Sequence, residues 1–561
     1  MGEAFLKSTL PVRDSFVLGD TSLALPAKLT TGSSTKAGSK DRSLRVQQQV
    51  QLTLSRKARK SDAPESLILT SENKAPEMTV ERAVSLLSQD DEEMLIGAVS
   101  YIQNECHRSA DAQKMVSNLH GIEKLLQLVV SDNEEVQRLA AGALRNVVFQ
   151  NNNNKEEVMG NDGLACVLDA LKSSRDVDTR RQLTGLLWTL SSHEPLKERL
   201  SREALSVLTE SVLVPGSGIS EGENPKHELL MDADVFHFAT HCLRNISSGG
   251  PACRKAMRNC GNLIDCLVFY IRRTIADRKT DDESAEHCIF ILNNLSYEME
   301  AELPRKYLKE SQQNLAPKPK THLEQQSPLL EEKSNPCGIE WLWNTITVRM
   351  YLSLIACSVC HSKQEAAIGA LHNITARIGV MSQAIAFTIV RENGLQHMKK
   401  VLQEGESNVK MAAISLIRNL SHYPKLQPDI VKKVLPDAMQ MLFNDDSATD
   451  LSSDVMVPLF DILTNLSQTD SQTVKDIFKQ GALQRIINIS REDNGYGQTR
   501  AAQAACKLLH TMWSHSELHG FYKKCGYRKS DFINPRTTKA VNSGRNFLVS
   551  QFNKETNYFL F

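Results

Sequence analysis

One pattern of apolar and polar positions recurs along the chain, with a single asparagine inside an apolar helical run. The run reads Leu139-Ala-Ala-Gly-Ala-Leu-Arg-Asn-Val-Val148, and shorter versions return at 242–247, 370–375 and 416–421. A buried amide is costly unless it is hydrogen-bonded, so a position that keeps asparagine indicates a hydrogen bond made in every copy. A period of about 40–47 residues is typical of armadillo and HEAT solenoids.

Aligning these runs defines nine copies, separated by 42, 43, 56, 49, 79, 46, 46 and 45 residues. Thr189 replaces the asparagine in the third copy and His510 replaces it in the ninth. We therefore predict an all-α, right-handed superhelical armadillo-repeat solenoid whose third helices line a concave groove. The aligned residues are Asn104, Asn146, Thr189, Asn245, Asn294, Asn373, Asn419, Asn465 and His510.

A second apolar segment, which usually begins with glycine, precedes several of the long runs. It occurs at 121–129, 163–171, 394–402 and 481–487. The glutamates that follow Asn133 are placed in the first turn of the next helix, where the helix dipole favours them. Each copy is therefore expected to contain at least two helices of different length.

Changes of composition divide the chain into five parts. Residues 1–75 carry an excess of Lys and Arg and little apolar surface, which predicts a flexible basic head. Repeats 1–5 are expected over 76–299 and repeats 6–9 over 339–527. The proline-rich segment 300–338 is predicted to be a disordered insertion between repeats 5 and 6, and 528–561 a C-terminal tail.

One stretch of the head has the spacing of a short amphipathic helix that docks on a partner. A basic run, 56–60, follows it, and a solvated charge run is the alternative interpretation. The apolar residues of this predicted docking motif are Leu44, Val46, Val50, Leu52 and Leu54.

Composition excludes several classes of function. Lys plus Arg equals Asp plus Glu at 66 each, so no global charge excess supports nucleic-acid binding. The twelve cysteines lack a disulfide framework, and no apolar run is long enough to cross a membrane, so we expect a reduced, intracellular chain. The motif Cys357-Ser-Val-Cys-His361 matches the c-type haem attachment pattern, but haem attachment needs an extracytoplasmic protein with a signal sequence. A zinc site would need a second ligand pair, and none has suitable spacing. We expect no enzyme activity, no cofactor and no metal site.

The residue before each aligned asparagine varies, and it is expected to select the partner. In repeats 2–4 it is Arg145, Trp188 and Arg244. A positive groove with one exposed aromatic residue suits an acidic peptide with an apolar anchor. Two alternatives stay open: the asparagines tie neighbouring repeats together, and Trp188 packs between repeats. The candidate peptide-binding residues are Arg145, Asn146, Arg180, Arg181, Trp188, Arg244, Asn245, Asn294, Asn373, Arg418 and Asn419.

Nine armadillo repeats with an insertion after the fifth resemble the p120-catenin/plakophilin family. The similarity is carried by 331–336, 340–343, 349–355, 185–188 and 517–519. It implies a desmosomal plaque protein that binds desmosomal cadherin tails, desmoplakin, plakoglobin and intermediate filament proteins. It further implies a location at the cytoplasmic face of the plasma membrane, in the cytoplasm and in the nucleus.

The chain differs from the usual family pattern at several points, and two other functions are alternatives. The head is shorter than is usual in the family, and Thr189 and Cys337 depart from its pattern. A nuclear transport adaptor would need tryptophan and asparagine pairs on successive third helices, and only Trp188 among four tryptophans is expected to lie on one. A nuclear or RNA-associated armadillo regulator is the main alternative function.

Overall fold

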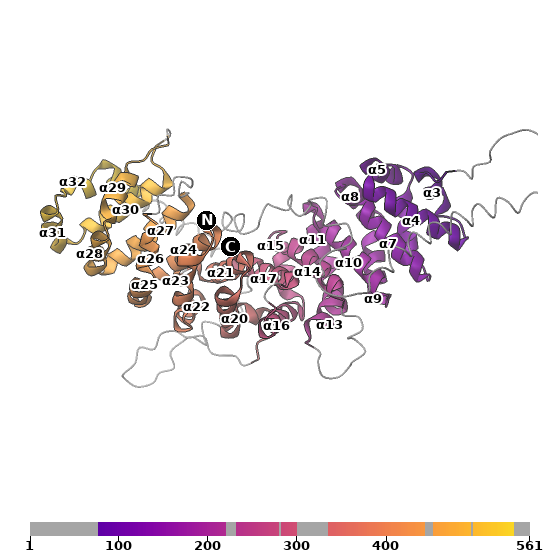
Figure 1. Cartoon of the computed structure of the whole chain (residues 1–561), viewed down its shortest axis with the longest axis horizontal. Helices are drawn as coiled ribbons and strands as arrows, with labels where there is room; N and C mark the ends of the chain where they lie inside the picture. Colours follow the sequence, from indigo (N-terminus) through magenta and orange to yellow (C-terminus); the bar gives the residue numbers. More distant parts are fainter. Residues whose placement is uncertain are drawn as a thin grey trace, which may run out of the picture.

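The computed structural model describes residues 77–219, 232–279, 282–299, 335–377, 379–443, 453–494 and 497–543. These residues form an elongated, curved stack of helices that runs in sequence order from α3 to α32 (Figure 1). Among them, no helix is both long and apolar enough to cross a membrane. The predicted head-docking motif lies outside the described residues.

The nine aligned runs form the long third helices of nine repeats within the described ranges. Each of these helices packs against the next one along the chain, as a solenoid requires. They are α4 (Glu92–Arg108), α7 (Glu134–Val147), α10 (Val177–Ser191), α14 (Ala233–Ser247), α17 (Glu283–Ser296), α21 (His361–Thr375), α24 (Ser407–Ser421), α27 (Ser453–Thr469) and α30 (Arg500–Trp513).

Two further groups of helices, most of them shorter, complete the repeats. The second helices are α3 (Val80–Leu86), α6 (Gly121–Val129), α9 (Gly163–Ser173), α16 (Leu263–Ala276), α20 (Thr345–Cys357), α23 (Gly394–Glu404), α26 (Leu435–Gln440) and α29 (Ala482–Ser490). In repeat 4 this place is taken by α12 (Leu205–Leu208), the π-helix η2 (Thr209–Leu213) and α13 (Val214–Ser217). The first helices are α5 (Ala110–Asn118), α8 (Asn152–Gly160), α11 (Glu194–Glu203), α15 (Pro251–Asn259), α22 (Val380–Arg391), α25 (Gln427–Lys433) and α28 (Ser471–Lys479).

The glycine that opens several second helices is required by close packing against the preceding helix. A Cβ at Gly121 would lie 2.7 Å from Val116 Cγ1, and one at Gly163 would lie 2.5 Å from the carbonyl oxygen of Val158. The residue before each of these glycines has a positive φ, 56° at His120 and 53° at Asp162. This left-handed backbone conformation turns the chain sharply from the first helix into the second.

The end of the predicted insertion returns to the repeat that precedes it. The 3-10 helix η4 (Gly338–Trp343) lies beside α16. Asp265 of α16 accepts hydrogen bonds from the backbone N–H of Gly338 at 2.9 Å and from the indole N–H of Trp341 at 3.0 Å. A carboxylate with two such donors fixes where repeat 6 begins.

The start of the segment predicted as a tail is packed on the last repeat. After α31 (His519–Lys524), the short helix α32 (Lys529–Phe532) places Phe532, fully buried, against Trp513 at 5.2 Å between ring centroids. Arg536 pairs with Asp493 at 2.9 Å. Residues up to 543 therefore close the apolar end of the solenoid.

Candidate peptide-binding site on the third helices

The aligned asparagines tie each third helix to the one before it. Their amide nitrogens donate to the C-terminal end of the preceding third helix, which answers one of the two interpretations left open by the sequence. The bonds run from Asn146 to Gln103 O (2.8 Å), Asn245 to Ser191 Oγ (3.0 Å), Asn294 to Ser247 Oγ (2.8 Å), Asn373 to Asn293 O (3.1 Å), Asn419 to His372 O (3.0 Å) and Asn465 to Ser421 Oγ (2.9 Å).

Burial limits what these asparagines offer to a ligand. Asn245, Asn294 and Asn419 are buried, and Asn294 is fully so. Asn146 and Asn373 are half-buried. At Thr189, which replaces the asparagine in repeat 3, the hydroxyl donates to Gly185 O of its own helix, so this tie is missing there. A contact between the asparagines and a peptide remains a prediction.

In repeats 2–4, the side chain just before the asparagine position contacts the next third helix. The residue that it contacts there lies three positions before the residue aligned with it. The Arg145 guanidinium covers Gly185, where a Cβ would lie 2.8 Å from Arg145 Cζ. Trp188 packs on His241 at 4.4 Å between ring centroids, and Arg244 lies 4.0 Å from the ring centroid of Phe290. We call this row of contacts the third-helix face.

Arg145 is the cation of this face for which the structure supplies no acidic partner among the described residues. It is half-buried, and burial lowers the pKa of its guanidinium to about 10. Its guanidinium lies 4.7 Å from the ring centroid of Phe238 on α14. A desolvated cation beside an aromatic ring can receive a carboxylate and an apolar side chain together.

Arg180 is a correction to the predicted site. Only 3% of it is exposed, and its guanidinium donates to Leu171 O at 2.9 Å and to Ser211 O at 2.6 Å. These bonds link the second and third helices of repeat 3 to repeat 4. Arg180 is therefore a structural residue of the helix layers.

Arg181 and Arg418 lie on third helices but are already paired. Arg181 contacts Asp178, Asp232 and Asp234 at 2.5, 2.7 and 3.1 Å. Arg418 pairs with Asp461 at 2.7 Å. The positive charge expected from these two residues is compensated by acidic partners.

Trp188 is a second correction, because it is not the exposed aromatic residue that the sequence predicted. It is 9% exposed and lies between His241 and Phe238, whose ring stacks on it at 5.4 Å. The more accessible ring is the half-buried Phe238, seven residues before Asn245. A search of that register for aromatic residues would have found it.

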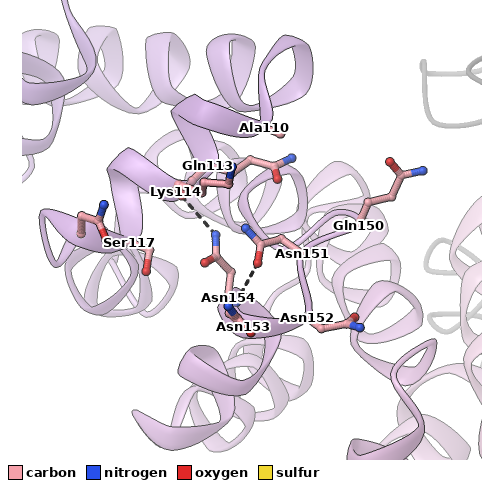
Figure 2. Close-up of a pocket in the computed structure, with 10 residues that line it drawn as sticks. Ala110, Gln113, Lys114, Ser117, Gln150, Asn151, Asn152, Asn153 and Asn154 are labelled. Carbon is pink, nitrogen blue, oxygen red and sulfur yellow. Dashed lines mark hydrogen bonds between the residues drawn. The ribbon is translucent and has the colours of Figure 1, made fainter.

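A hollow near repeat 2 was not predicted either. It lies between α5 and the start of α8 and is lined by amide and hydroxyl side chains (Figure 2). Its amides serve the fold, since Asn154 Nδ2 donates to Gln113 O at 3.1 Å and Gln113 Nε2 donates to Asn146 O at 3.0 Å. The hollow therefore continues the network that holds Asn146.

Comparison with known proteins identifies homologues of this chain. A model of the armadillo/beta-catenin-like repeat matches residues 109–149. Plakophilin-2 of Danio rerio is 49% identical over 494 residues, which cover 84% of this chain and 60% of the relative. The chain is a homologue of the plakophilins. Plakophilin-2 of Homo sapiens is 42% identical, over 83% of this chain and 60% of the relative. Plakophilin-3 of Bos taurus is 31% identical, over 81% and 60%.

This plakophilin homologue spans about 60% of the length of the curated relatives that it matches. The resemblance seen in the sequence is confirmed, and so is the armadillo-repeat fold.

Similarity to solved structures supports the fold and nothing further, because the sequence identities are low. One comes from work on a phosphorylation switch in the interaction between cadherin and beta-catenin. It has a TM-score of 0.56 at 14% identity and covers 89% of this chain and 82% of its own. An engineered protein has a TM-score of 0.56 at 17% identity and covers 82% of this chain and 98% of its own.

Proposed function

We propose that the chain is a non-enzymatic scaffold of the desmosomal plaque. It would link desmosomal cadherin tails to desmoplakin and intermediate filaments, with plakoglobin as a further partner, and so support cell–cell adhesion. Homology to the plakophilins carries this proposal. The expected locations are the desmosome at the cytoplasmic face of the plasma membrane, the cytoplasm and the nucleus. The same comparisons favour the scaffold over the RNA-associated alternative.

We infer that an acidic tail binds the third-helix face around Arg145. A ligand carboxylate would pair with this guanidinium, which lacks an acidic partner among the described residues. An apolar side chain of the ligand would pack on Phe238, next to the Trp188 ring. Burying a charge-assisted pair beside an aromatic ring gives both affinity and orientation.

A titration with a labelled acidic cadherin-tail peptide tests this site. Arg145→Gln should weaken binding by about tenfold and flatten the salt dependence, because a hydrogen bond to a charged group contributes about 1.5–3 kcal/mol. Arg202→Gln on α11 is the matched control: it removes the same charge from an exposed side chain of a first helix. Equal affinity of the two variants at all salt concentrations would exclude this site.

Localisation of the tagged chain in epithelial cells tests the wider role. Enrichment at desmoplakin-positive junctions is expected, and deletion of residues 1–75 shows how much the head contributes. A diffuse or purely nuclear distribution of the full chain in cells with mature desmosomes would contradict the scaffold role.

A further inference from the structure

Three histidines meet where repeat 4 packs against repeat 5. His237 and His241 lie one turn apart on α14, and His287 lies on α17, the neighbouring helix (Figure 1). One ring nitrogen of each lies within 4.8 Å of the others. The ring centroid of His287 is 4.4 Å from that of His241 and 5.0 Å from that of His237.

Two of the rings carry buried nitrogens without a partner. His241 and His287 are 8% and 6% exposed, and His241 Nδ1 and His287 Nε2 make no hydrogen bond. Orphaned polar atoms in a packed junction are rare and call for an explanation. Burial holds the pKa of both imidazoles well below the usual range, so both rings are neutral at pH 7 and retain a lone pair.

We propose that His237, His241 and His287 bind a divalent cation of the zinc class. Two histidines four residues apart on one helix are a known metal-chelating arrangement, and imidazole suits Zn²⁺, Co²⁺, Ni²⁺ and Cu²⁺. Three protein ligands leave a fourth position for water. Tetrahedral ligands at a Zn–N distance of about 2.1 Å lie about 3.4 Å apart, so side-chain rotation must bring the nitrogens closer by at most about 1.4 Å.

The surroundings both support and oppose the ion. Glu283 Oε2 lies 4.0 Å from His237 Nδ1, too far for a hydrogen bond but close enough to attract a cation through its charge. Arg244 Nη1 donates to His287 Nδ1 at 3.3 Å, so His287 can bind the ion through Nε2 only in the other tautomer, with Nδ1 protonated and this hydrogen bond lost. The Arg244 charge also repels the cation. The ion would join α14 to α17, and this proposal does not depend on peptide binding.

Titration of the full chain with Zn²⁺ by calorimetry, and with Co²⁺ by absorption, tests the site. The competing ligands are thiols, above all the Cys357 and Cys360 pair, of which Cys357 is exposed. The variants are therefore His241→Ala, His287→Ala and the double Cys357→Ser/Cys360→Ser. His397→Ala on α23, a half-buried histidine outside the cluster, is the matched control. Because Trp188 contacts His241, bound Co²⁺ should also quench part of the tryptophan fluorescence.

Wild type, His397→Ala and the cysteine variant should each bind one ion through nitrogen ligands, without sulfur-to-cobalt charge transfer. Each cluster variant should lose at least about tenfold in affinity. Arg244→Gln, which leaves all three imidazoles in place, should bind at least about threefold more tightly because a repelling charge is gone. The proposal is overturned if binding survives in His287→Ala, if it is lost only with the cysteines, or if Arg244→Gln binds no more tightly than wild type.

Discussion

Removing one inter-repeat asparagine should open a single junction of the solenoid. Asn294 is fully buried and its amide donates to Ser247 Oγ at 2.8 Å, while its own Oδ1 has no hydrogen-bond partner. Asn294→Ala removes the bond between α14 and α17 and leaves a small cavity. The net loss of a buried hydrogen bond is about 0.5–1.5 kcal/mol, and the cavity brings the total to about 1–3 kcal/mol.

Hydrogen exchange measured by mass spectrometry is the assay, because a repeat solenoid opens locally rather than in one transition. Amides of α14 and α17 should exchange about 5- to 150-fold faster in Asn294→Ala, the range that corresponds to 1–3 kcal/mol. Asn104→Ala is the matched control: Asn104 has the same register in α4, and no third helix precedes α4 in the described residues. Equal effects in the two variants, or none at Asn294, would refute the role assigned to the asparagines.

Three further predictions concern charge and the ends of the repeats. Burial raises the pKa of Glu365 to about 7, so the folded state holds a proton between pH 4.5 and 7 that the unfolded state releases, and stability falls as pH rises through this window. Glu365→Gln should therefore increase the free energy of unfolding at pH 8 by at most about 3 kcal/mol, which is measured as a higher melting midpoint. It should have little effect below pH 5. Asp265→Ala should cost about 2–3 kcal/mol and speed hydrogen exchange over 336–344, because Gly338 and Trp341 lose their acceptor. Unchanged exchange there would contradict this docking role. Deleting 528–543 should cost about 3–5 kcal/mol locally and lower the protection of α30, an effect that an unpacked tail would not produce.

Much of the architecture was predictable because one register runs through the chain. The asparagine position locates the third helix of each repeat in the sequence. The apolar segment that begins with glycine locates the second helix, as 121–129 does for α6. Both signals are local, since each depends on residues within one helix or one turn. They were sufficient to predict the fold without any knowledge of how neighbouring repeats meet.

The candidate site was harder to predict because it depends on contacts between repeats. Arg180 and Arg181 are neighbours, but Arg181 is seven residues before Trp188 and lies within about 20° of it around the helix, whereas Arg180 is eight residues before Trp188 and lies about 80° away from it. Helical arithmetic could have separated these two. The burial of Trp188 could not be predicted in this way, because Phe238 and His241 come from the next repeat.

The histidine cluster was missed for the same reason. His237 and His241 have a visible four-residue spacing, but His287 follows 46 residues later and joins them only through the packing of α17 on α14. The expectation of no metal site considered cysteine pairs within one segment. Inspecting all third helices in a common register would have placed the three histidines close together.

The central claim is that Arg145 receives a carboxylate of an acidic partner, and a charge-swap cycle tests it most directly. Arg145→Glu should weaken binding of an acidic cadherin-tail peptide, and peptides with single acidic residues changed to lysine should be screened against it. One such peptide is expected to recover affinity with Arg145→Glu but not with wild type, with a coupling energy of at least about 1.5 kcal/mol. If Arg145→Glu binds the unchanged peptide as tightly as wild type does, and no substituted peptide couples to it, the third-helix face around Arg145 is not the binding site.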